Sequence, residues 1–435
     1  MKDMNNKNQL INKIEQGCFD THFASLYGED TLAYQKERYS KVVDSHYNTF
    51  GRHQKIYLFS SPGRVEIVGN HTDHNNGCVL CGAINLDIIG AVSKNEDEMV
   101  RIYSEEFGSF TVDLTDFEIH EEERNTPEAL VRGTAASCKD RGWGIGGFDA
   151  CFSSDLMVGS GLSSSAAFEV MIATIFSYLY NETPIPLDEV ASIGMMAETR
   201  YFGKPSGLMD QMAAAVGGIT FIDFQDSWRP KFEALDFNLS SMGLAIVVVD
   251  TGESHEDLVS NYASIPFEMS CVAGFFGQEH LRGVQEAQIM EKLRILREEC
   301  GDRAVLRALH YLDENKRVIL ATEAIKKGDG EGLLNIINES GSSSFQYLQN
   351  IYDDNTPQSQ NLTLALYLAN KALSHRGACR VHGGGFAGTT LNLVPYDMLE
   401  SFISVQEKAF YKGCCHILKI RDVGGTILLE EKFDV

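Results

Sequence analysis

The chain has 435 residues, a hydrophobic fraction of 43% and a net charge of −24, from 37 Lys and Arg against 61 Asp and Glu. So acidic a surface repels nucleic acid and anionic membranes, because neutralising phosphate takes Lys and Arg. Any phosphate must be held locally, by backbone N–H groups, a metal or a few chosen cations. The length favours two large domains with ordinary hydrophobic cores.

The N-terminal stretch MKDMNNKNQLINKIEQG has no apolar centre typical of a secretory signal, and no apolar run is long enough to cross a membrane. The ten cysteines show no disulfide framework, so reduced thiols and a cytoplasmic location are expected. The CVLC pair at 78–81 has no second pair at zinc-ribbon spacing. Structural burial is therefore favoured there over a metal or redox role.

Residues 1–50 are expected to be helical, polar and rather exposed. Short strands follow: two are predicted in KIYLFSSPGRVEIVG, separated at Pro62-Gly63, and more across 79–94 and 100–114. The run at 163–180 is apolar on most faces, which predicts a buried helix. Helical spacing returns in LDEVASIGMMAETRYFG and GLMDQMAAAVGG, and the strand ITFIDF follows.

A polar connection at 225–243 marks the predicted boundary between domains 1–240 and 241–435. The second half mixes helices with short strands. The expected helices lie at about 285–299, 315–326, 359–375 and 397–411, and the expected strands are LAIVVVD, GTTLNLV, HILKIR and GTILLEE. Because regular βαβ units are missing, this pattern indicates an α+β fold.

The stretch GRVEIVGNHTDHNNG at 63–77 collects carboxylates, imidazoles and amides on a tight turn. Such a turn suits a pocket that hydrogen-bonds several hydroxyls at once. A solvated Asn/Gly turn explains the same residues equally well. A metal site from His71, Asp73 and His74 matches no known metal-binding spacing.

The stretch GSGLSSSAAFEV at 159–170 has glycines that let a ligand approach the backbone, then three serines, then a long helix. The free N–H groups of a helix N-terminus hold phosphate, so this loop is a candidate polyphosphate site. It is not a Walker loop, and two glycines with three serines are more than a simple helix cap needs. The candidate nucleotide-binding residues are Gly159, Ser160, Gly161, Ser163, Ser164 and Ser165.

Two carboxylates, Glu198 and Asp210, lie on either side of GKPSG. One could bind Mg²⁺ while the other takes a proton, although two surface acids are the default reading in an acidic protein. Late in the chain, VHGGGFAGTTLNLV formally fits the G-x-G-x-x-G dinucleotide fingerprint. A strand-like run follows it where that fingerprint needs a helix, so a glycine-rich turn against the phosphate loop is predicted instead.

Together and in this order, these stretches resemble the GHMP small-molecule kinases, and among them the galactokinases. PGRVEIVGNHTDHNNG is similar to the galactokinase signature P-G-R-V-N-L-I-G-E-H-T-D-Y-N-x-G, and GSGLSSSAAFEV to the superfamily's phosphate loop. GKPSGLMDQ resembles G-x-P-x-G-x-M-D-Q, and RVHGGGFAGTT resembles the C-terminal glycine motif. The resemblance runs from about residue 56 to the end of the chain.

The resemblance implies a two-domain GHMP kinase fold with the active site between the domains, and ATP-dependent phosphorylation of D-galactose at its anomeric hydroxyl. ATP phosphates would lie on the loop at 159–165, and Mg²⁺ would be held by Ser164, with Ser163 as its neighbour, and by Glu198. The expected partner is a small sugar, with no nucleic acid and no membrane, and the expected assembly is a monomer or small homo-oligomer.

Asp210 would be the base facing the anomeric hydroxyl, with Arg64 beside it. A carboxylate in reach can accept the hydroxyl proton, and an arginine keeps that carboxylate ionised while offsetting phosphoryl charge. The sugar contacts implied by the resemblance are Asn70, His71, Asp73, Gly207 and Tyr262. Tyr262 comes from HEDLVSNY, which is only loosely similar to the family's stretch.

The chain departs from the signature at three positions. Asn70 stands where galactokinases usually carry a Glu that bonds the sugar's 6-hydroxyl, His74 replaces a Tyr, and Glu66 replaces an Asn. PEALVRG at 127–133 lacks the usual aromatics, so adenine packing is expected to differ, and Ser254 replaces an Arg.

These departures leave three hypotheses: a divergent galactokinase, a kinase for another sugar such as galacturonate, and a galactose sensor without catalysis. The intact SSSAA run and Asp210 favour an enzyme.

Overall fold

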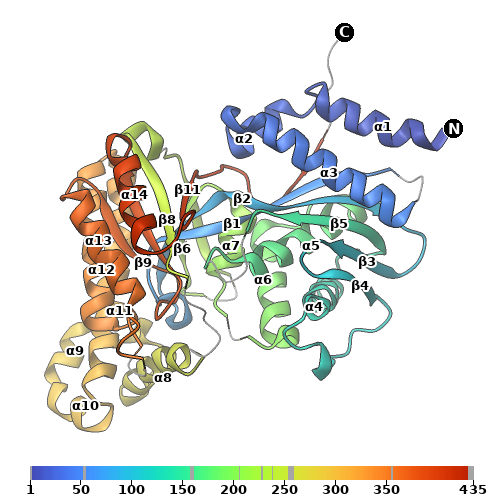
Figure 1. The fold of residues 1–435 in the computed structure, drawn as a ribbon. Coiled ribbons are helices and arrows are strands. Elements are labelled where there is room, and N and C mark those ends of the chain that lie inside the picture. Colours follow the sequence, from blue (N-terminus) through green and yellow to red (C-terminus); the bar gives the residue numbers. More distant parts are fainter. Residues whose placement is uncertain are drawn as a thin grey trace.

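The computed structural model describes residues 2–51, 55–156, 161–204, 206–226, 229–237, 239–252, 259–353 and 356–429. Two sheets form its frame, with helices packed on them (Figure 1). The first sheet contains β1 (Tyr57–Val68), β2 (Cys78–Lys94), β3 (Met99–Ser104), β4 (Gly108–Asp113), β5 (Phe148–Ser154), β6 (Ile219–Asp223), β7 (Lys231–Leu235) and β12 (Thr426–Leu428). The second contains β8 (Leu244–Asp250), β9 (Ala378–His382), β10 (Thr389–Pro395) and β11 (Cys415–Leu418).

The helices of the first half are α1 (Lys2–Glu15), α2 (Asp20–Tyr27), α3 (Leu32–Phe50), α4 (Pro127–Asp140), α5 (Ser164–Tyr180), α6 (Leu187–Met196) and α7 (Met209–Val216). Those of the second half are α8 (Val259–Phe275), α9 (Glu286–Glu291), α10 (Leu293–Glu299), α11 (Asp302–Lys327), α12 (Gly330–Ser343), α13 (Asn361–Leu373) and α14 (Leu399–Ala409). A one-turn π-helix, Ala197–Phe202, continues from α6.

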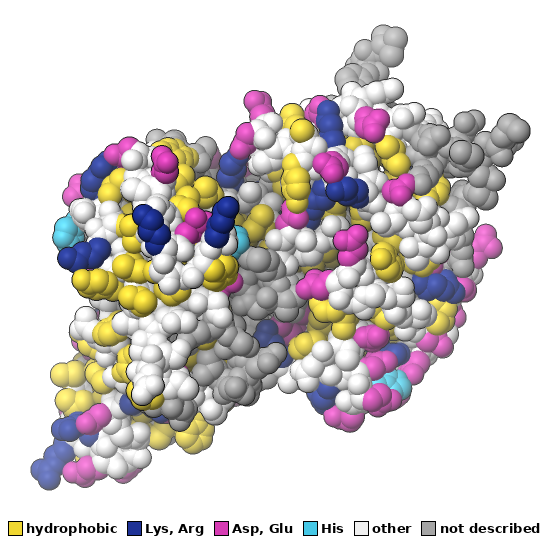
Figure 2. Space-filling model, viewed as in Figure 1, with side chains coloured by type: hydrophobic (Ala, Val, Ile, Leu, Met, Phe, Trp, Pro, Cys, Tyr) yellow, Lys and Arg dark blue, Asp and Glu magenta, His cyan; other side chains and the backbone are white. Residues whose placement is uncertain are grey.

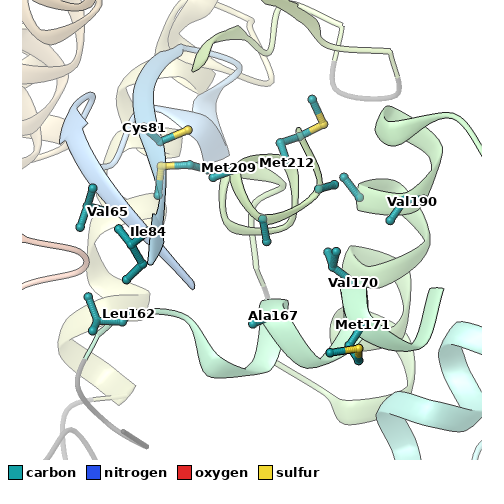
Figure 3. Close-up of a cluster of buried hydrophobic side chains, with 14 of the residues drawn as sticks. Val65, Cys81, Ile84, Leu162, Ala167, Val170, Met171, Val190, Met209 and Met212 are labelled. Carbon is teal, nitrogen blue, oxygen red and sulfur yellow. The ribbon is translucent and has the colours of Figure 1, made fainter. Parts of the chain in front are cut away.

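The first sheet has the order β12-β1-β2-β5-β3-β4, and β6 pairs with β2 and β7. Helices α1 to α3 lie on one face, and α4 to α7 on the other (Figure 1). Figure 3 shows part of the core between the sheet and α5 to α7, which includes Val65 and Ile84 of the strands and Val170 and Met212 of the helices. Cys81 is fully buried in this cluster, which agrees with structural burial of the CVLC pair.

The N-terminal helices are confirmed, but the prediction that residues 1–50 are rather exposed is wrong for one face. Phe23, Tyr39 and Val43 are buried against Ile89 of β2 and Cys151 of β5. In α3 the buried residues Tyr39, Val42, Val43 and His46 recur at helical spacing, so the sequence does contain a pattern for this face, and the sheet beneath makes it part of the core.

The two strands predicted on either side of Pro62-Gly63 are one strand, β1, with a register irregularity between Pro62 and Arg64. Proline has no N–H for the ladder, which interrupts pairing with β2 locally without ending the strand. At this point Arg64 N donates to Leu162 O at 3.2 Å, and a Cβ on Gly63 would lie 2.6 Å from that same oxygen. The irregularity therefore allows the segment before α5 to approach the backbone of β1 closely.

The second sheet has the order β11-β8-β10-β9, with α12, α13 and α14 packed against it (Figure 1). Helices α8, α9, α10 and α11 share a separate hydrophobic cluster. Sequence reasoning did not predict α8, α12 or β9, and α11 is longer than the expected 315–326. Helix α8 contains Pro266, which reads as a breaker in sequence. The first turns of α11 do carry an apolar helical pattern, with Ala304, Val305 and Ala308 buried, which the predicted start at 315 overlooked.

The chain passes from the first sheet to the second between β7 and β8, and β12 returns to pair antiparallel with β1. The division into domains 1–240 and 241–435 stays a prediction. Across the described residues, no helix is both long and apolar enough to span a membrane. Acidic side chains are spread over the face shown in Figure 2 and gather at its lower right edge, where α4 and β4 lie in Figure 1.

Candidate active site

The loop between β1 and β2, residues 69–77 (the 69–77 loop), has a backbone that few residues adopt. Gly69 has φ 119°, and a Cβ there would collide with the backbone of β2. His71 and Asn76 both have φ 58°, in the left-handed region that non-glycine residues rarely enter. A 3₁₀ turn, Asp73–Asn75, lies between them. Contacts from outside the loop must therefore hold this shape.

Helix α11 supplies many of those contacts. Glu314 Oε1 accepts the backbone N–H groups of Gly69 at 3.0 Å and Asn70 at 3.3 Å, and His310 Nε2 donates to Asn70 O at 3.0 Å. Burial would raise the pKa of Glu314, but the neighbouring His310 and Arg317 outweigh it and lower that pKa to about 2. A charged carboxylate thus anchors the backbone at the start of the loop.

Asp210 lies in the first turn of α7 and forms a two-pronged ion pair with Arg64 of β1. Arg64 Nε lies 2.6 Å from Asp210 Oδ1 and Nη2 lies 2.9 Å from Oδ2, while Ser163 donates its hydroxyl to Oδ2. Burial alone would raise the pKa of Asp210, but the Arg64 charge and the hydrogen bonds from Arg64 and Ser163 bring that pKa below its ordinary value. Asp210 is therefore an ionised carboxylate at neutral pH.

Asp73 lies directly against Gly207, where a Cβ would overlap its carboxylate, so any side chain at 207 would displace that carboxylate. Burial, reinforced by the charge of Asp210, raises the pKa of Asp73. The rings of His71 and His74 lie 5.6 Å apart, and burial lowers the pKa of His71 to about 3 and of His74 to about 4. The structure thus places Asp73 against Gly207 and near enough to Asp210 for their charges to interact, and both imidazoles are neutral at pH 7.

Two predicted phosphate-loop residues, Gly159 and Ser160, lie outside the described residues. From Gly161 onward the loop leads into α5, which begins at Ser164, one residue after the predicted start at 163. Gly161 has φ 71° and accepts Arg64 Nη1 at its carbonyl at 2.5 Å. A Cβ on Gly161 would lie 3.0 Å from Thr389 Oγ1, so the loop packs closely on the start of β10.

Glu198 lies beside the N-terminus of α5 and is almost fully buried. Its Oε1 accepts Ser165 Oγ at 2.9 Å and Lys204 Nζ at 2.7 Å, and its Oε2 accepts Gln211 Nε2 at 3.0 Å. The serine that contacts Glu198 is therefore Ser165, whereas the predicted metal ligand was Ser164. Successive helix residues point about 100° apart, and Ser165 is the one whose direction meets the π-helical turn.

Oxygen ligands are what Mg²⁺ prefers, and Ser165 with Glu198 presents a hydroxyl and a carboxylate at a helix N-terminus. The donor set fits that ion. Burial would lower the pKa of Lys204, but the charge of Glu198 outweighs burial and raises that pKa above its ordinary value. Lys204 is therefore a cation, and it supplies the positive charge beside Glu198.

The third glycine motif is a turn between β9 and β10, residues 383–385 (the glycine turn). A strand follows it, which confirms that it is no dinucleotide fingerprint. Its second carbonyl accepts His71 Nε2 at 2.9 Å, and its third accepts the hydroxyl of Tyr262 at 2.8 Å. A Cβ on Gly384 would overlap the Tyr262 ring. The turn thus packs against His71 and Tyr262, two of the predicted sugar contacts.

Asn70 is completely buried, and its amide is engaged with the protein itself. Nδ2 donates to Gly383 O at 2.7 Å and to Glu66 Oε1 at 3.1 Å. Glu66 in turn pairs with Arg380 at 2.7 Å, and both side chains are buried. The side chain of Asn70 is therefore turned into the protein, towards Gly383 and Glu66.

A family model described as the galactokinase galactose-binding signature matches residues 44–94, and one for the GHMP kinase N-terminal domain matches residues 129–218. The galactokinase of Glaesserella parasuis serovar 5 (strain SH0165) is 31% identical over 361 residues, which cover 81% of this chain and 88% of the relative. The galactokinase of Actinobacillus pleuropneumoniae serotype 3 (strain JL03) is 31% identical over 345 residues, which cover 78% and 85%.

This chain belongs to the galactokinase family. The fold agrees: Lactococcus lactis galactokinase, solved with galactose, superposes with a TM-score of 0.75 at 23% identity and covers 89% of this chain and 98% of its own. Methanococcus jannaschii mevalonate kinase reaches 0.60 at 15% identity, covering 85% and 99%. The predicted resemblance and the α+β GHMP kinase fold are both confirmed.

The galactokinase signature includes Arg64 and the 69–77 loop, and the GHMP kinase domain model includes the residues from α5 to Asp210. Sequence reasoning missed the residues that hold them, chiefly Glu314, His310 and Arg380. Arg380 begins the quoted RVHGGGFAGTT, yet nothing in that pattern shows that it is buried. His310 and Glu314 share one face of α11 at i, i+4 spacing, a pattern that is usually a solvated helix face.

Proposed function

We propose that this protein transfers the γ-phosphoryl group of ATP to the anomeric hydroxyl of D-galactose. The observation that carries the proposal is the ionised Asp210, which Arg64 holds between the 69–77 loop and the N-terminus of α5. That position joins a candidate base to a loop rich in hydroxyl-binding groups and to a phosphate-binding helix end. Membership of the galactokinase family supports the same reaction.

In this proposal Asp210 accepts the hydroxyl proton as the bond to phosphorus forms. A carboxylate with a lowered pKa is a weak base, which suits phosphoryl transfer, because bond formation to the entering oxygen is limited in a loose transition state. Arg64 donates to Asp210 and to the Gly161 carbonyl, so its guanidinium spans the base and the phosphate loop. From there it offsets charge on the transferring group.

The proposed sugar contacts are His71, Asp73, Gly207 and Tyr262. The neutral imidazole of His71 and the carboxylate of Asp73 provide the mixed donors and acceptors that sugar hydroxyls need. Gly207 leaves room beside Asp73 that any side chain would fill. Asn70 is left out of this set, because its amide is engaged elsewhere.

The phosphates of ATP are proposed to bind the loop at 159–165 and the first turn of α5. We assign Mg²⁺ to Ser165 and Glu198 in place of Ser164, on the contact between those two side chains. When bound, Mg²⁺ neutralises charge on the phosphate oxygens. Residues 127–133 begin α4 without aromatic side chains, so the adenine contacts are proposed to come from other elements.

The test is ADP release by the purified protein with Mg-ATP on galactose, galacturonate, arabinose and galactosamine. We expect the highest kcat/KM on galactose. A clear preference for galacturonate would replace galactose as the substrate while keeping the reaction class. Galactose binding in calorimetry without turnover on any of the four sugars would contradict an enzyme and identify a sensor.

A further inference from the structure

Three side chains from other elements each form a hydrogen bond to one of three successive carbonyl oxygens of the glycine turn. Asn70 donates to the first, Gly383 O, at 2.7 Å, and His71 and Tyr262 bond the second and third. Asn350 Nδ2 adds a bond to the second carbonyl at 3.1 Å. Because His71 and Tyr262 both donate hydrogen bonds to the turn, the positions of their side chains depend on the position of the turn.

Asn70 has no hydrogen-bonding capacity left for a ligand. Its two amide hydrogens serve Gly383 O and Glu66 Oε1, and its Oδ1 accepts Asn350 Nδ2 at 2.8 Å and Ser344 Oγ at 3.2 Å. An amide offers two donor hydrogens and two acceptor lone pairs, so all four are used. The side chain is also fully buried.

Glu66 is the other half of this arrangement. Its carboxylate has a side-chain exposure of 3% and lies 2.7 Å from Arg380 Nη2, while Arg380 Nη1 donates to Ile67 O at 3.0 Å. A buried charge of this kind persists only when it is paired and hydrogen-bonded. The signature that this loop resembles has Asn and Glu in the two places where this chain has Glu66 and Asn70. The amide and the carboxylate have thus changed places.

We infer that Glu66 and Asn70 form a clamp (the 66–70 clamp) that holds the glycine turn against the 69–77 loop. Asn70 is a positioning residue: it sets His71 and Tyr262 and does not touch the sugar. The inference rests on the proposed function, because it takes those two residues as galactose contacts.

The order of amide and carboxylate matters because of what each faces. A carboxylate at position 70 would set an acceptor oxygen against Gly383 O, where Asn70 now donates. It would also bring a second buried negative charge to Glu66, with Arg380 as the cation that already pairs with Glu66. The isosteric variant Asn70→Asp therefore loosens the turn without removing volume.

For Asn70→Asp we expect the KM for galactose to rise roughly tenfold while the KM for ATP stays within about twofold, since only the sugar side loses a bond. Protonation of the new carboxyl would restore a donor toward Gly383 O. The galactose KM of Asn70→Asp should therefore fall as the pH is lowered towards 5, relative to wild type. Asn70→Ala, which has no titrating group, should show no such recovery.

The matched control is Asn392→Asp. Asn392 of β10 is as fully buried as Asn70, and its amide donates to Val247 O within the second sheet. A general loss of stability from burying a charge should appear in both variants. The selective rise in galactose KM should appear in Asn70→Asp alone.

A double-mutant cycle followed by urea unfolding tests the clamp without measuring enzymatic activity. Asn70→Glu should lower the urea midpoint, and the double variant Glu66→Asn/Asn70→Glu should unfold at higher urea than Asn70→Glu alone, because it again holds one carboxylate and one amide. A galactose KM unchanged in Asn70→Asp, or a double variant no more stable than Asn70→Glu, would overturn the inference. A wild type inactive on galactose would contradict the proposed function and leave the urea cycle valid.

Discussion

At the scale of single residues, the chemistry depends on Asp210, a carboxylate that is charged although it is largely enclosed. Asp210→Asn keeps the shape of the side chain and removes its capacity to accept a proton. We expect kcat to fall by roughly 10²- to 10⁴-fold with ATP affinity nearly unchanged. Single-turnover assays and nucleotide titration measure the two quantities separately. A near-normal rate would show that Asp210 is not the base.

Arg64 controls the charge of that base. It lowers the pKa of Asp210 against the effect of burial, so its removal should raise that pKa. In Arg64→Gln the acidic limb of the kcat/KM profile should move to higher pH, because a greater fraction of Asp210 is protonated at a given mild acidity. We also expect kcat to fall by roughly 10²-fold or more through lost charge stabilisation. Arg64→Lys, which keeps the charge, should shift the limb less; an unmoved limb in Arg64→Gln would contradict the coupling.

The residues that sequence reasoning predicted and those it missed differ in kind. Arg64, Asp73 and Asp210 lie in short motifs whose residue types reflect the chemistry. Arg380 and Glu314 act by holding other residues, and their partners are hundreds of positions away or on another element. Such contacts arise only when the two sheets come together, so no local pattern contains them.

At the scale of elements, α11 is the support of the 69–77 loop. Four of its residues bond the backbone from Gly69 to Cys78, namely His310, Tyr311, Glu314 and Asn315. The sequence predicted only residues 315–326 of this helix, so His310, Tyr311 and Glu314 lay outside the predicted element, and the polar residues of its inner face serve a loop rather than water. Short strands were predicted within β1 and β2 from strand-like runs and turn breakers, although both faces of these strands are buried, one under α1 to α3 and the other under α4 to α7.

Glu314→Gln tests this support through stability. The pKa of Glu314 is about 2 against an ordinary 4.5, which corresponds to about 3 kcal/mol of stability. Since the folded pKa is depressed, this stability is fully present above the unfolded pKa and is lost as pH falls through about 2. We expect Glu314→Gln to be less stable than wild type by about 3 kcal/mol at pH 7, with the gap narrowing below pH 4.5.

Urea unfolding at pH 7 and pH 3 measures that gap. The matched control is Glu323→Gln on the same helix, whose half-exposed side chain pairs with Lys327 at 3.1 Å. An exposed pair of this kind contributes little, so the control should differ from wild type by under about 1 kcal/mol at both pH values. A gap for Glu314→Gln that does not narrow in acid would contradict the assignment.

At the scale of the whole molecule, the net charge of −24 opposes the approach of a polyanion. Acidic side chains spread over the surface create a negative potential that low salt leaves unscreened (Figure 2). We expect kcat/KM for ATP to rise about threefold as ionic strength increases from about 10 mM to about 150 mM, since the screening length falls from about 30 Å to about 8 Å. Galactose is neutral, so kcat/KM for the sugar at saturating ATP is the internal control. An equal change for both substrates would point to an effect on the fold rather than on encounter.

The pairing of β12 with β1 has a consequence for how the molecule is made. Arg421 bonds Ser60 across 361 positions and reaches Asp87, whose other oxygen is held by Arg38. On the ribosome, most of the first sheet is synthesised long before residues 421–428. During that interval one edge of β1 has no strand paired to it, and the carboxylate of Asp87 lacks its contact with Arg421. The first half of the protein is thus the first to begin folding and among the last parts to finish.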